Sequence, residues 1–263
     1  MTIPKVETIR IEIDSETAVA TLCRPERLNA VAEQLLAELV SLADWLRCQE
    51  GIHFLVLDHE GPVFSAGAHL GEVRGFLADQ AHAAAKLRSN QRLAQEMMSK
   101  MSSLDQITFA AIRGPAYGAG MAIAMTCDFR VMADDAIAQL PETNLGMFLT
   151  YGSTPFLVKA MGLSRAKEMI LFADPWSAAR CLEAGVVERV VAKDQVRPTI
   201  EGMIASLRAK DWTALRIGKQ VANAAAAVRF GDMVMSEPEL VAATLASQEV
   251  ADRLDGFLKR PRS

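Results

Sequence analysis

The stretch from Gly114 to Asp128 constrains the fold more than any other part of the sequence. A run of β-forming residues, Ile107 to Ile112, leads into a turn with three glycines, and an apolar run, Met121 to Met125, follows with helix-compatible composition. Glycines let a backbone approach a ligand closely, and the free N–H groups at a helix start favour negative charge. The pattern therefore predicts a turn that binds a phosphate or stabilises an oxyanion, or, more simply, a tight strand-to-helix connection with small residues for packing.

Composition excludes several classes of function. The 263 residues are 51% hydrophobic and 23% charged, which is typical of a soluble globular protein, and the formal net charge of −4 gives no general attraction for nucleic acid. The four cysteines lack metal-type spacing, so we expect free thiols in a reducing compartment and no metal. The sequence shows neither a signal pattern nor an apolar run of roughly 20 residues, so we expect a cytoplasmic protein with no membrane partner.

Strands and helices alternate up to about residue 192. The alternation of Ile9, Ile11 and Ile13 predicts a half-buried strand that forms a hairpin with residues 18–22. Asn29 is placed to cap the helix that follows, which carries a leucine stripe. Further strands are expected at residues 54–57, 129–133 and 186–191, and further helices at about 81–101 and from Thr154, Ser164 and Ser177.

From about residue 195 the composition becomes wholly helical. Asp211 is one candidate N-cap, and Ser236 to Glu239 forms a capping box. No linker rich in Gly, Pro or Ser separates this part from the rest. We therefore divide the chain into a core, residues 1–194, and a helical region, residues 195–263, whose leucines need a core or another subunit to pack against.

Three segments stand out together: Arg24-Pro25-Glu26-Arg27-Leu28-Asn29-Ala30, Phe64-Ser65-Ala66-Gly67-Ala68-His69-Leu70, and Gly114 to Asp128 continuing to Pro141-Glu142. In this order and separation they resemble the crotonase (enoyl-CoA hydratase/isomerase) family, and the likeness covers roughly residues 5 to 192. It implies an α/β superhelix of ββα units with a C-terminal helical oligomerisation region. It also implies a homotrimer or a dimer of trimers (a hexamer), and a coenzyme A thioester as substrate without a separate cofactor.

The resemblance also implies an oxyanion hole. The backbone N–H groups of Ala68 and Ala119 would donate to the thioester carbonyl oxygen. Most family members have glycine where Ala119 stands, but a main-chain donor requires no particular side chain. His69 stands where the family usually has aspartate, which leaves the role of this side chain open. We expect a loop histidine with satisfied hydrogen bonds, since no metal ligands lie at suitable spacing.

Binding of the CoA moiety is assigned by the same resemblance. Ala66, next to the donor at Ala68, and the backbone near Leu28 would line the adenine pocket. Arg24 and Arg27 are candidates for binding the CoA phosphates, because a guanidinium suits phosphate geometry. Alternatively, both arginines lie on a solvated loop.

One carboxylate remains where hydratases of this family present two. In register, the first position is Ala122, which cannot titrate, and the second is Glu142. The segment from Pro141 to Gly146 is similar to that of Δ3,Δ2-enoyl-CoA isomerases, which also keep only the second glutamate. The resemblance thus implies isomerisation of a 3-enoyl-CoA to the trans-2-enoyl-CoA, with Glu142 moving a proton from C2 to C4 through a dienolate.

Several alternatives stay open. A hydratase would need a second acid from elsewhere, for which Glu72 is the residue to inspect, and some single-glutamate members trap enolates or cleave carbon–carbon bonds. A protein of another class would be a CoA-binding or scaffold subunit without turnover. Separately, Glu142 could be only a surface charge on a loop. Tyr151 is either a polar contact to substrate or a packing residue. The pocket floor is expected from the helix at residues 81–101 and the region around Phe148.

Overall fold

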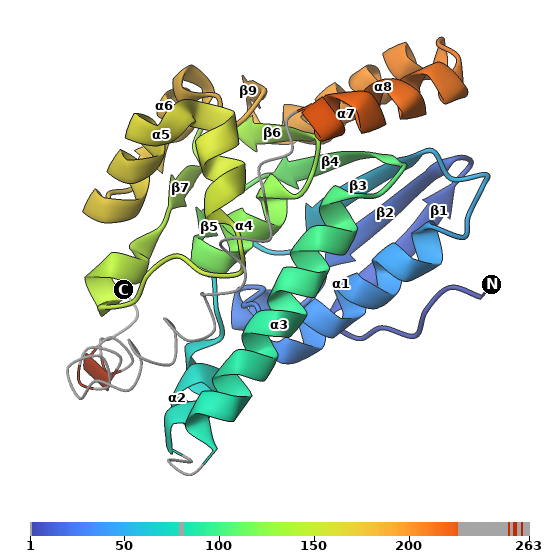
Figure 1. Cartoon of the computed structure of the whole chain (residues 1–263). Coiled ribbons are helices and arrows are strands. Elements are labelled where there is room, and N and C mark those ends of the chain that lie inside the picture. Colours follow the sequence, from blue (N-terminus) through green and yellow to red (C-terminus); the bar gives the residue numbers. More distant parts are fainter. Residues whose placement is uncertain (1, 79–81, 226–251, 253–254, 257–258, 260–263) are drawn as a thin grey trace.

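The computed structural model describes residues 2–78, 82–225, 252, 255–256 and 259. Its main sheet, which Figure 1 shows at the centre of the molecule, has six strands. The strand order is β1-β2-β3-β4-β6-β9. β1 and β2 form the expected antiparallel hairpin, and the remaining pairs are parallel. Every residue of β3 and β4 is buried, as expected for strands covered on both faces. The strands are β1 (Ile9–Asp14), β2 (Thr17–Leu22), β3 (Phe54–His59), β4 (Ile107–Ile112), β6 (Phe129–Ala133) and β9 (Arg189–Val191).

A second sheet, of three strands, brings together the two segments that later form the site. It contains β5 (Ala116–Tyr117), β7 (Ile137–Gln139) and β8 (Trp176–Ser177). β5 pairs in parallel with β7, so the segments that leave these strands start from the same edge. β5 continues into helix α4 (Gly118–Met125), the predicted helix after the glycine turn, and the 3₁₀ helix η2 (Pro141–Leu145) follows β7.

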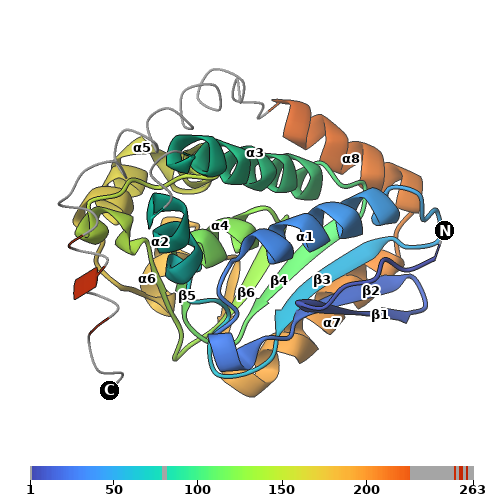
Figure 2. The ribbon, with the colours of Figure 1, turned by 90° about the horizontal axis from the view of Figure 1, so that it is seen from below.

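Helices cover both faces of the main sheet. α1 (Glu33–Leu46) and α3 (Ala83–Ser102) lie side by side on one face (Figure 2). α3 confirms the helix expected at residues 81–101, and its methionine stripe is buried. α7 (Val196–Arg208) packs against β4 and β6 and is followed by α8 (Trp212–Ala225). None of the helices in the described part of the chain has the length and apolarity that a bilayer crossing requires.

The predicted cap of α1 is wrong. Ala32, not Asn29, occupies the N-cap position, and its side chain makes no cap hydrogen bond. Instead the backbone N–H of Glu33 donates to Glu72 Oε2 at 3.0 Å. Glu72 belongs to α2 (Leu70–Ala78), a helix that the sequence did not lead us to expect because its two glycines lower helix propensity. A carboxylate distant in sequence thus supplies the cap and favourable charge at the helix start.

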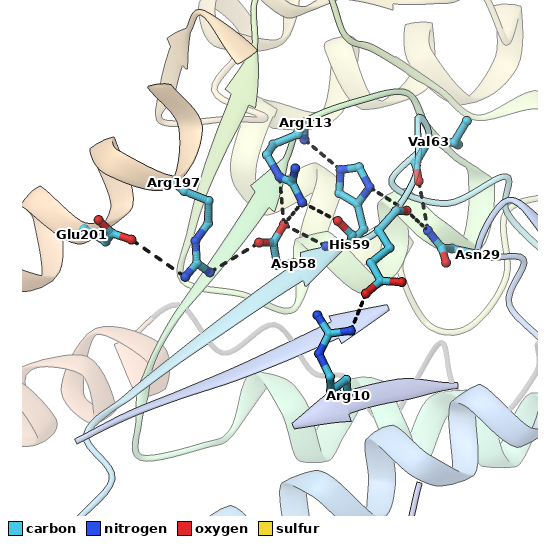
Figure 3. Close-up of polar contacts among 9 residues, drawn as sticks. Arg10, Asn29, Asp58, His59, Val63, Arg113, Arg197 and Glu201 are labelled. Carbon is cyan, nitrogen blue, oxygen red and sulfur yellow. Dashed lines mark hydrogen bonds and ion pairs between the residues drawn. The ribbon is translucent and has the colours of Figure 1, made fainter. Parts of the chain in front are cut away.

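Asn29 instead holds two loops together. It is buried in the left-handed region with φ of 50°. Its side-chain amide donates to the carbonyl oxygens of Glu60 and Val63 at 2.9 and 3.1 Å (Figure 3). Its Oδ1 accepts from the backbone N–H of Arg24. These bonds fix the segment 24–29 against the turn that precedes Phe64.

A polar network pins the ends of β3 and β4 to α7 (Figure 3). Arg113 donates from Nε and Nη2 to Asp58 Oδ1 at 3.0 and 2.9 Å, and Arg197 of α7 lies 3.4 Å from Asp58 Oδ2. The backbone N–H of Arg113 donates to Nε2 of the buried His59. Burial, helped by the Arg113 charge, lowers the pKa of His59 to about 4. The imidazole is therefore neutral at physiological pH, and its Nε2 accepts the hydrogen bond from the Arg113 N–H.

The helices after η2 match the expectations in part. The segment α5 (Thr154–Phe172) consists of two helices that meet at a kink, where Gly162 has non-helical φ and ψ of 78° and 162°. The two helices expected from Thr154 and Ser164 are therefore confirmed. α6 (Ala178–Ala184) has Ser177 as N-cap, as predicted, and Gly185 as C-cap. Asp211 Oδ1 accepts from the backbone N–H of Ala214 at 2.8 Å at the start of α8, as predicted. The capping box from Ser236 and the leucines at 240, 245 and 254 lie outside the described residues.

Candidate active site

Ala68 presents a main-chain donor that the fold leaves unused. It forms a short parallel bridge with Val31, whose N–H donates to Gly67 O at 2.7 Å. The backbone N–H of His69 donates to Val31 O at 2.9 Å. Both bonds are made by the neighbours of Ala68, so the Ala68 N–H points away from this pair, and no described residue accepts from it.

Ser65 and Gly67 set the path of this segment. Ser65 is fully buried, and its Oγ donates to Asn29 O at 2.7 Å and accepts from the Gly67 N–H at 3.2 Å. Gly67 has φ of 86°, and a Cβ there would lie 3.0 Å from Tyr117 O and 3.7 Å from Ala119 N. Only glycine allows this conformation and this approach without strain, so residues 65–68 lie directly against the start of α4.

The start of α4 supplies further donors. Tyr117 is the N-cap residue without a side-chain cap, and its N–H donates to Ser65 O at 2.9 Å. The N–H groups of the first turn, including that of Ala119, therefore have no acceptor within the helix. Ala119 and Ala68 line the same pocket. Two main-chain segments from distant parts of the sequence thus face one space, where the helix dipole also favours negative charge.

Glu142 completes this arrangement from η2. Its carboxylate packs against the helix start, since a Cβ placed on Gly118 would lie 2.5 Å from Glu142 Oε1. Gly118 has φ of 44°, so the conformation and the space both require glycine. The residue is partly exposed in the cleft, but its Oε2 is enclosed and receives a hydrogen bond from none of the described residues. An enclosed, unpartnered carboxylate oxygen is costly unless a ligand uses it.

Burial also changes the acidity of Glu142. Desolvation raises the pKa of its carboxyl group to about 7, with its own backbone N–H acting in the opposite direction. A carboxyl group with this pKa exchanges a proton readily at neutral pH, which is the property required of a general acid or base. Glu142 is therefore the titratable group in this cleft whose environment fits proton transfer.

The pocket beyond Glu142 is mainly apolar. It encloses about 650 Å³ of space, part of it open to solvent. α3 and the segment after η2 line it, as expected for the pocket floor, and α2, which was not expected, lines it as well. Its apolar side chains are Val73, Phe76, Leu87, Met147, Phe148 and Leu149. We call this space the inner pocket; Ala122, at the position of the missing first glutamate, also lines it.

An outer pocket opens on the other side of Glu142 and is more polar. It shares Ala68 and Glu142 with the inner pocket and extends along Ala66 and Gly118. The two spaces therefore form one cleft that passes both the free amide of Ala68 and the carboxylate. A ligand lying through the cleft would place its middle between these groups.

The loop residues predicted to bind CoA are Arg24, Arg27 and Leu28, and they line neither the inner nor the outer pocket. Leu28 O accepts from the Ala66 N–H at 2.9 Å, which ties the loop to the donor segment. Leu28 is 37% exposed, Arg27 is exposed, and Arg24 lies 3.6 Å from the exposed Glu26. The exposed guanidinium of Arg27 is available for a ligand in solvent, whereas Arg24 already has a carboxylate near it.

Glu72 and His69 have structural contacts. Glu72 caps α1 through the Glu33 N–H and lines neither pocket. His69 Nδ1 accepts from the Glu72 N–H at 3.2 Å, the contact of an N-cap side chain at the start of α2. The described residues include no group of three or more His, Cys, Asp or Glu that could hold a metal ion.

Sequence reasoning did not single out Ser65 or the contact between Gly118 and Glu142. Ser65, Gly118 and Glu142 all lie inside the three segments quoted above, so the sequence indicated the region but not the contacts. The contacts themselves join residues 24 to 36 positions apart, and no local pattern reveals them.

A comparison with known proteins places this geometry in a family. The model of the enoyl-CoA hydratase/isomerase family matches residues 12–262. The chain belongs to this family. The enoyl-CoA hydratase/isomerase (crotonase) fold, an α/β superhelix of ββα units, is therefore confirmed, and C-terminal helices are present.

Members of the enoyl-CoA hydratase/isomerase family match over nearly the whole chain. A probable enoyl-CoA hydratase of Mycobacterium bovis is 27% identical over 254 residues, which cover 97% of this chain and 96% of that protein. The enoyl-CoA hydratase of Bacillus halodurans has a TM-score of 0.88 at 20% identity and covers 95% of this chain and 100% of its own. A putative enoyl-CoA hydratase of Thermobifida fusca, solved in complex with acetoacetyl-CoA, has a TM-score of 0.75 at 28% identity and covers 89% and 93%.

Proposed function

We propose that this protein is an acyl-CoA enzyme that stabilises a thioester enolate and isomerises 3-enoyl-CoA to trans-2-enoyl-CoA, with Glu142 as its acid and base. The observation that supports the proposal most directly is the enclosed carboxylate of Glu142. It lines the same pocket as Ala68 and Ala119, and no other described carboxylate lines that pocket. The fatty acyl chain would occupy the inner pocket and the CoA moiety would leave through the outer one.

The chemistry follows from these groups. Glu142 takes a proton from C2, and the electron pair of that C–H bond delocalises onto the thioester oxygen to give a dienolate. Two N–H donors at that oxygen are worth about 3–4 kcal/mol each, and a positioned base contributes about 10²–10⁴-fold in rate. Glu142 then returns the proton to C4, which leaves the double bond between C2 and C3. Nothing is consumed, so no cofactor besides the substrate's own CoA is required.

Further parts of the proposal come from the family alone. Arg24, Arg27, Leu28 and Ala66 would contact the CoA moiety, with Arg27 the freer of the two guanidinium groups. Residues 1–194 would form the catalytic core and residues 195–263 the region that joins three copies, or two such trimers. α7 already packs on β4 and β6, so the first helix of this region also contributes to the core of its own subunit.

Hydration of a 2-enoyl-CoA is the second candidate, because the relatives carry the name hydratase. That reaction requires a water to be held and deprotonated while a proton reaches C2, and two carboxylates serve it best. The described part of this cleft offers Glu142 alone, with Ala122 where the other would stand. Glu72 is engaged with α1. These contacts favour isomerisation over hydration.

The test is to incubate the protein separately with cis-3-hexenoyl-CoA and with crotonyl-CoA, following conjugation of the double bond and addition of water. We expect isomerisation to be the faster reaction. Rapid hydration without isomerisation would reverse the order of the two candidates. Failure to bind any acyl-CoA would leave a scaffold subunit as the remaining interpretation.

A further inference from the structure

The carboxylate of Glu142 is held in place through its backbone. No other side chain of the described residues donates a hydrogen bond to it, and its Oε2 is enclosed. The carboxylate nevertheless fits closely against the start of α4, since a Cβ on Gly118 would lie 2.5 Å from Oε1 and 3.8 Å from Oε2. The position of this group therefore depends on where the 3₁₀ helix η2, which carries it, is fixed in the fold.

Thr143, the residue after Glu142, contacts α5 instead of the cleft. Its neighbours Glu142 and Asn144 line the outer pocket, whereas Thr143 lines neither pocket. The Thr143 hydroxyl donates to the carbonyl oxygens of Ile170 and Leu171 at 3.2 and 3.5 Å. Both carbonyls belong to the last turn of α5, where a helix has no N–H group of its own to offer them. The hydroxyl therefore joins η2 to acceptors that need a donor.

A second side chain makes a similar contact on the other side of Glu142. Gln139, the last residue of β7, donates from Nε2 to Ala173 O at 2.8 Å. Ala173 is the C-cap of α5 and lies in the left-handed region with φ of 54°. Residues 139 and 143 thus fasten the segment that carries Glu142 to the C-terminal end of α5 at two points.

A shift of η2 would change two properties of the Glu142 carboxylate. It would move the group relative to the substrate, and a misplacement of about 1 Å can lower a rate about 10²-fold. It would also admit water, so that the desolvation which raises the pKa of Glu142 to about 7 would be partly lost. The rate and the pH at which the group titrates therefore both report on its position.

We propose that Thr143 is a positioning residue: together with Gln139 it fastens η2 to the C-terminal end of α5, and it thereby holds the Glu142 carboxylate against Gly118. The role of this carboxylate in the reaction rests on the proposed function. Thr143 itself touches neither the substrate nor the reacting atoms.

The experiment removes the Thr143 hydroxyl and keeps the shape of the side chain, with Thr143→Val. Thr143→Ser keeps the hydroxyl and tests for rescue. Ser102→Ala is the matched control, because the Ser102 hydroxyl also donates to carbonyls in the last turn of a helix, those of Met98 and Ser99 at 2.7 and 3.3 Å, and Ser102 lines neither pocket.

Two measurements are made on each protein. The pH profile of kcat and of kcat/KM is recorded with cis-3-hexenoyl-CoA, beside the dissociation constant of butyryl-CoA. Infrared difference spectroscopy of the substrate-free proteins follows the titration of the Glu142 carboxyl group, whose band is identified by its loss in Glu142→Gln.

We expect Thr143→Val to lower kcat about tenfold and to leave the dissociation constant of butyryl-CoA within about threefold, since no ligand contact is removed. The titration of Glu142, and with it the rise of kcat/KM, moves toward lower pH by about one unit. Thr143→Ser restores both values to near those of the natural protein. Ser102→Ala changes neither, although its thermal midpoint falls by an amount similar to that of Thr143→Val.

An unchanged titration and an unchanged kcat in Thr143→Val would overturn the inference, because a hydroxyl that only stabilises the fold would move the thermal midpoint alone. If Thr143→Val does not fold, Gln139→Leu removes the other anchor. Its carboxyl titration, measured without substrate, is expected to move in the same direction, and no movement would overturn the inference.

Failure of this inference is distinguishable from failure of the proposed function. If the natural protein isomerises no 3-enoyl-CoA and the infrared titration still moves in Thr143→Val, the proposed function is wrong and the positioning contact is confirmed. If the natural protein isomerises the substrate and Thr143→Val behaves like Ser102→Ala, the function stands and the role of Thr143 is wrong.

Discussion

On one side of the cleft, residues 65–68 and 117–119 bond to one another and to the loop before them, and only N–H groups that face the cleft stay free. On the other side, residues 141–152 carry the Oε2 of Glu142 and the hydroxyl of Tyr151, both without partners among the described residues. We call these the amide wall and the carboxylate wall. The first is stabilised by its own contacts, and the second keeps polar groups unsatisfied.

The difference between the two walls indicates which of them lowers the stability of the folded chain in order to keep reactive groups in the cleft. The amide wall keeps its remaining hydrogen bonds, while the fold itself directs a few main-chain donors into the cleft. The carboxylate wall keeps a buried acid with a raised pKa and a tyrosine with positive φ, both of which destabilise the folded chain. Features of the second kind are common at functional sites, and they are the ones we expect to set the reaction and the substrate.

The largest effect is expected from removing the carboxylate of Glu142. Glu142→Gln keeps the shape of the side chain but cannot accept a proton. If the carboxylate wall carries the proton transfer, kcat/KM for 3-enoyl-CoA falls about 10²–10⁴-fold, while the dissociation constant for butyryl-CoA stays within a few-fold. Steady-state kinetics and calorimetry measure the two quantities. A Gln variant as active as the natural protein would remove Glu142 from the mechanism.

The second-largest effect is expected at the contact between the two walls, where Gly118 lies against Glu142. Gly118→Ala places a Cβ 2.5 Å from Glu142 Oε1, so the carboxylate must move although no functional group is lost. We expect kcat to fall about 10²-fold, since small misplacements of a catalytic group have effects of this size. Gly202→Ala is the control, because nothing lies within 4 Å of a Cβ there and no residue of α7 lines either pocket. Equal activity of both variants would show that the position of Glu142 is not critical.

The pH dependence tests the raised pKa of Glu142. Its folded pKa of about 7 lies above the ordinary value of 4.5, so the folded state binds more protons between these values. The free energy of unfolding therefore falls as pH rises from about 4.5 to 7, by about 3 kcal/mol in total, and stays lowered above that. Glu142→Gln removes this penalty and is the more stable protein at pH 8, with the gap closing near pH 4.5. Denaturant titrations at several pH values measure this gap.

The protonation state of Glu142 also sets how the catalytic activity depends on pH. The base form of Glu142 predominates above pH 7, so kcat/KM is expected to rise through about pH 7 and then level off. A rise centred near pH 4.5 would show that the carboxylate is solvated in solution.

The smallest effect concerns the amide wall. Ser65→Ala removes the hydroxyl between Asn29 O and the Gly67 N–H, and it lowers the free energy of unfolding by about 1–3 kcal/mol. kcat falls modestly, because the Ala68 amide is only loosened. Ser41→Ala on the exposed face of α1, where the hydroxyl bonds to Ala37 O, serves as a control expected to change stability by about 0.5 kcal/mol or less. Equal losses in both variants would contradict a special role for Ser65.

Much of this site could be predicted from the sequence. Each of the three residues Ala68, Ala119 and Glu142 comes from a quoted segment, and all three line a single pocket. Strand alternation and buried runs also gave the sheet, because those patterns depend on period alone. These are local signals, or signals of order and spacing along the chain.

What the sequence did not reveal depends on contacts between distant segments. The cap of α1 comes from Glu72, so Asn29 is free to hold the loop before Phe64. α2 forms despite two glycines, since its apolar residues pack with Leu87 of α3. The positive φ of Tyr151 is held by Gln91, and no rule based on residue type predicts it.

The bridge between Val31 and Ala68 has a consequence for mutational surveys of this protein. A peptide nitrogen survives every replacement of the side chain attached to its residue, apart from proline. An alanine scan would therefore leave positions 68 and 119 untouched, although their N–H groups are the donors proposed for the thioester oxygen, and larger side chains there would report on packing in the pocket instead. Only chemistry that edits the peptide unit itself, such as replacing the amide with an ester, would make these positions visible.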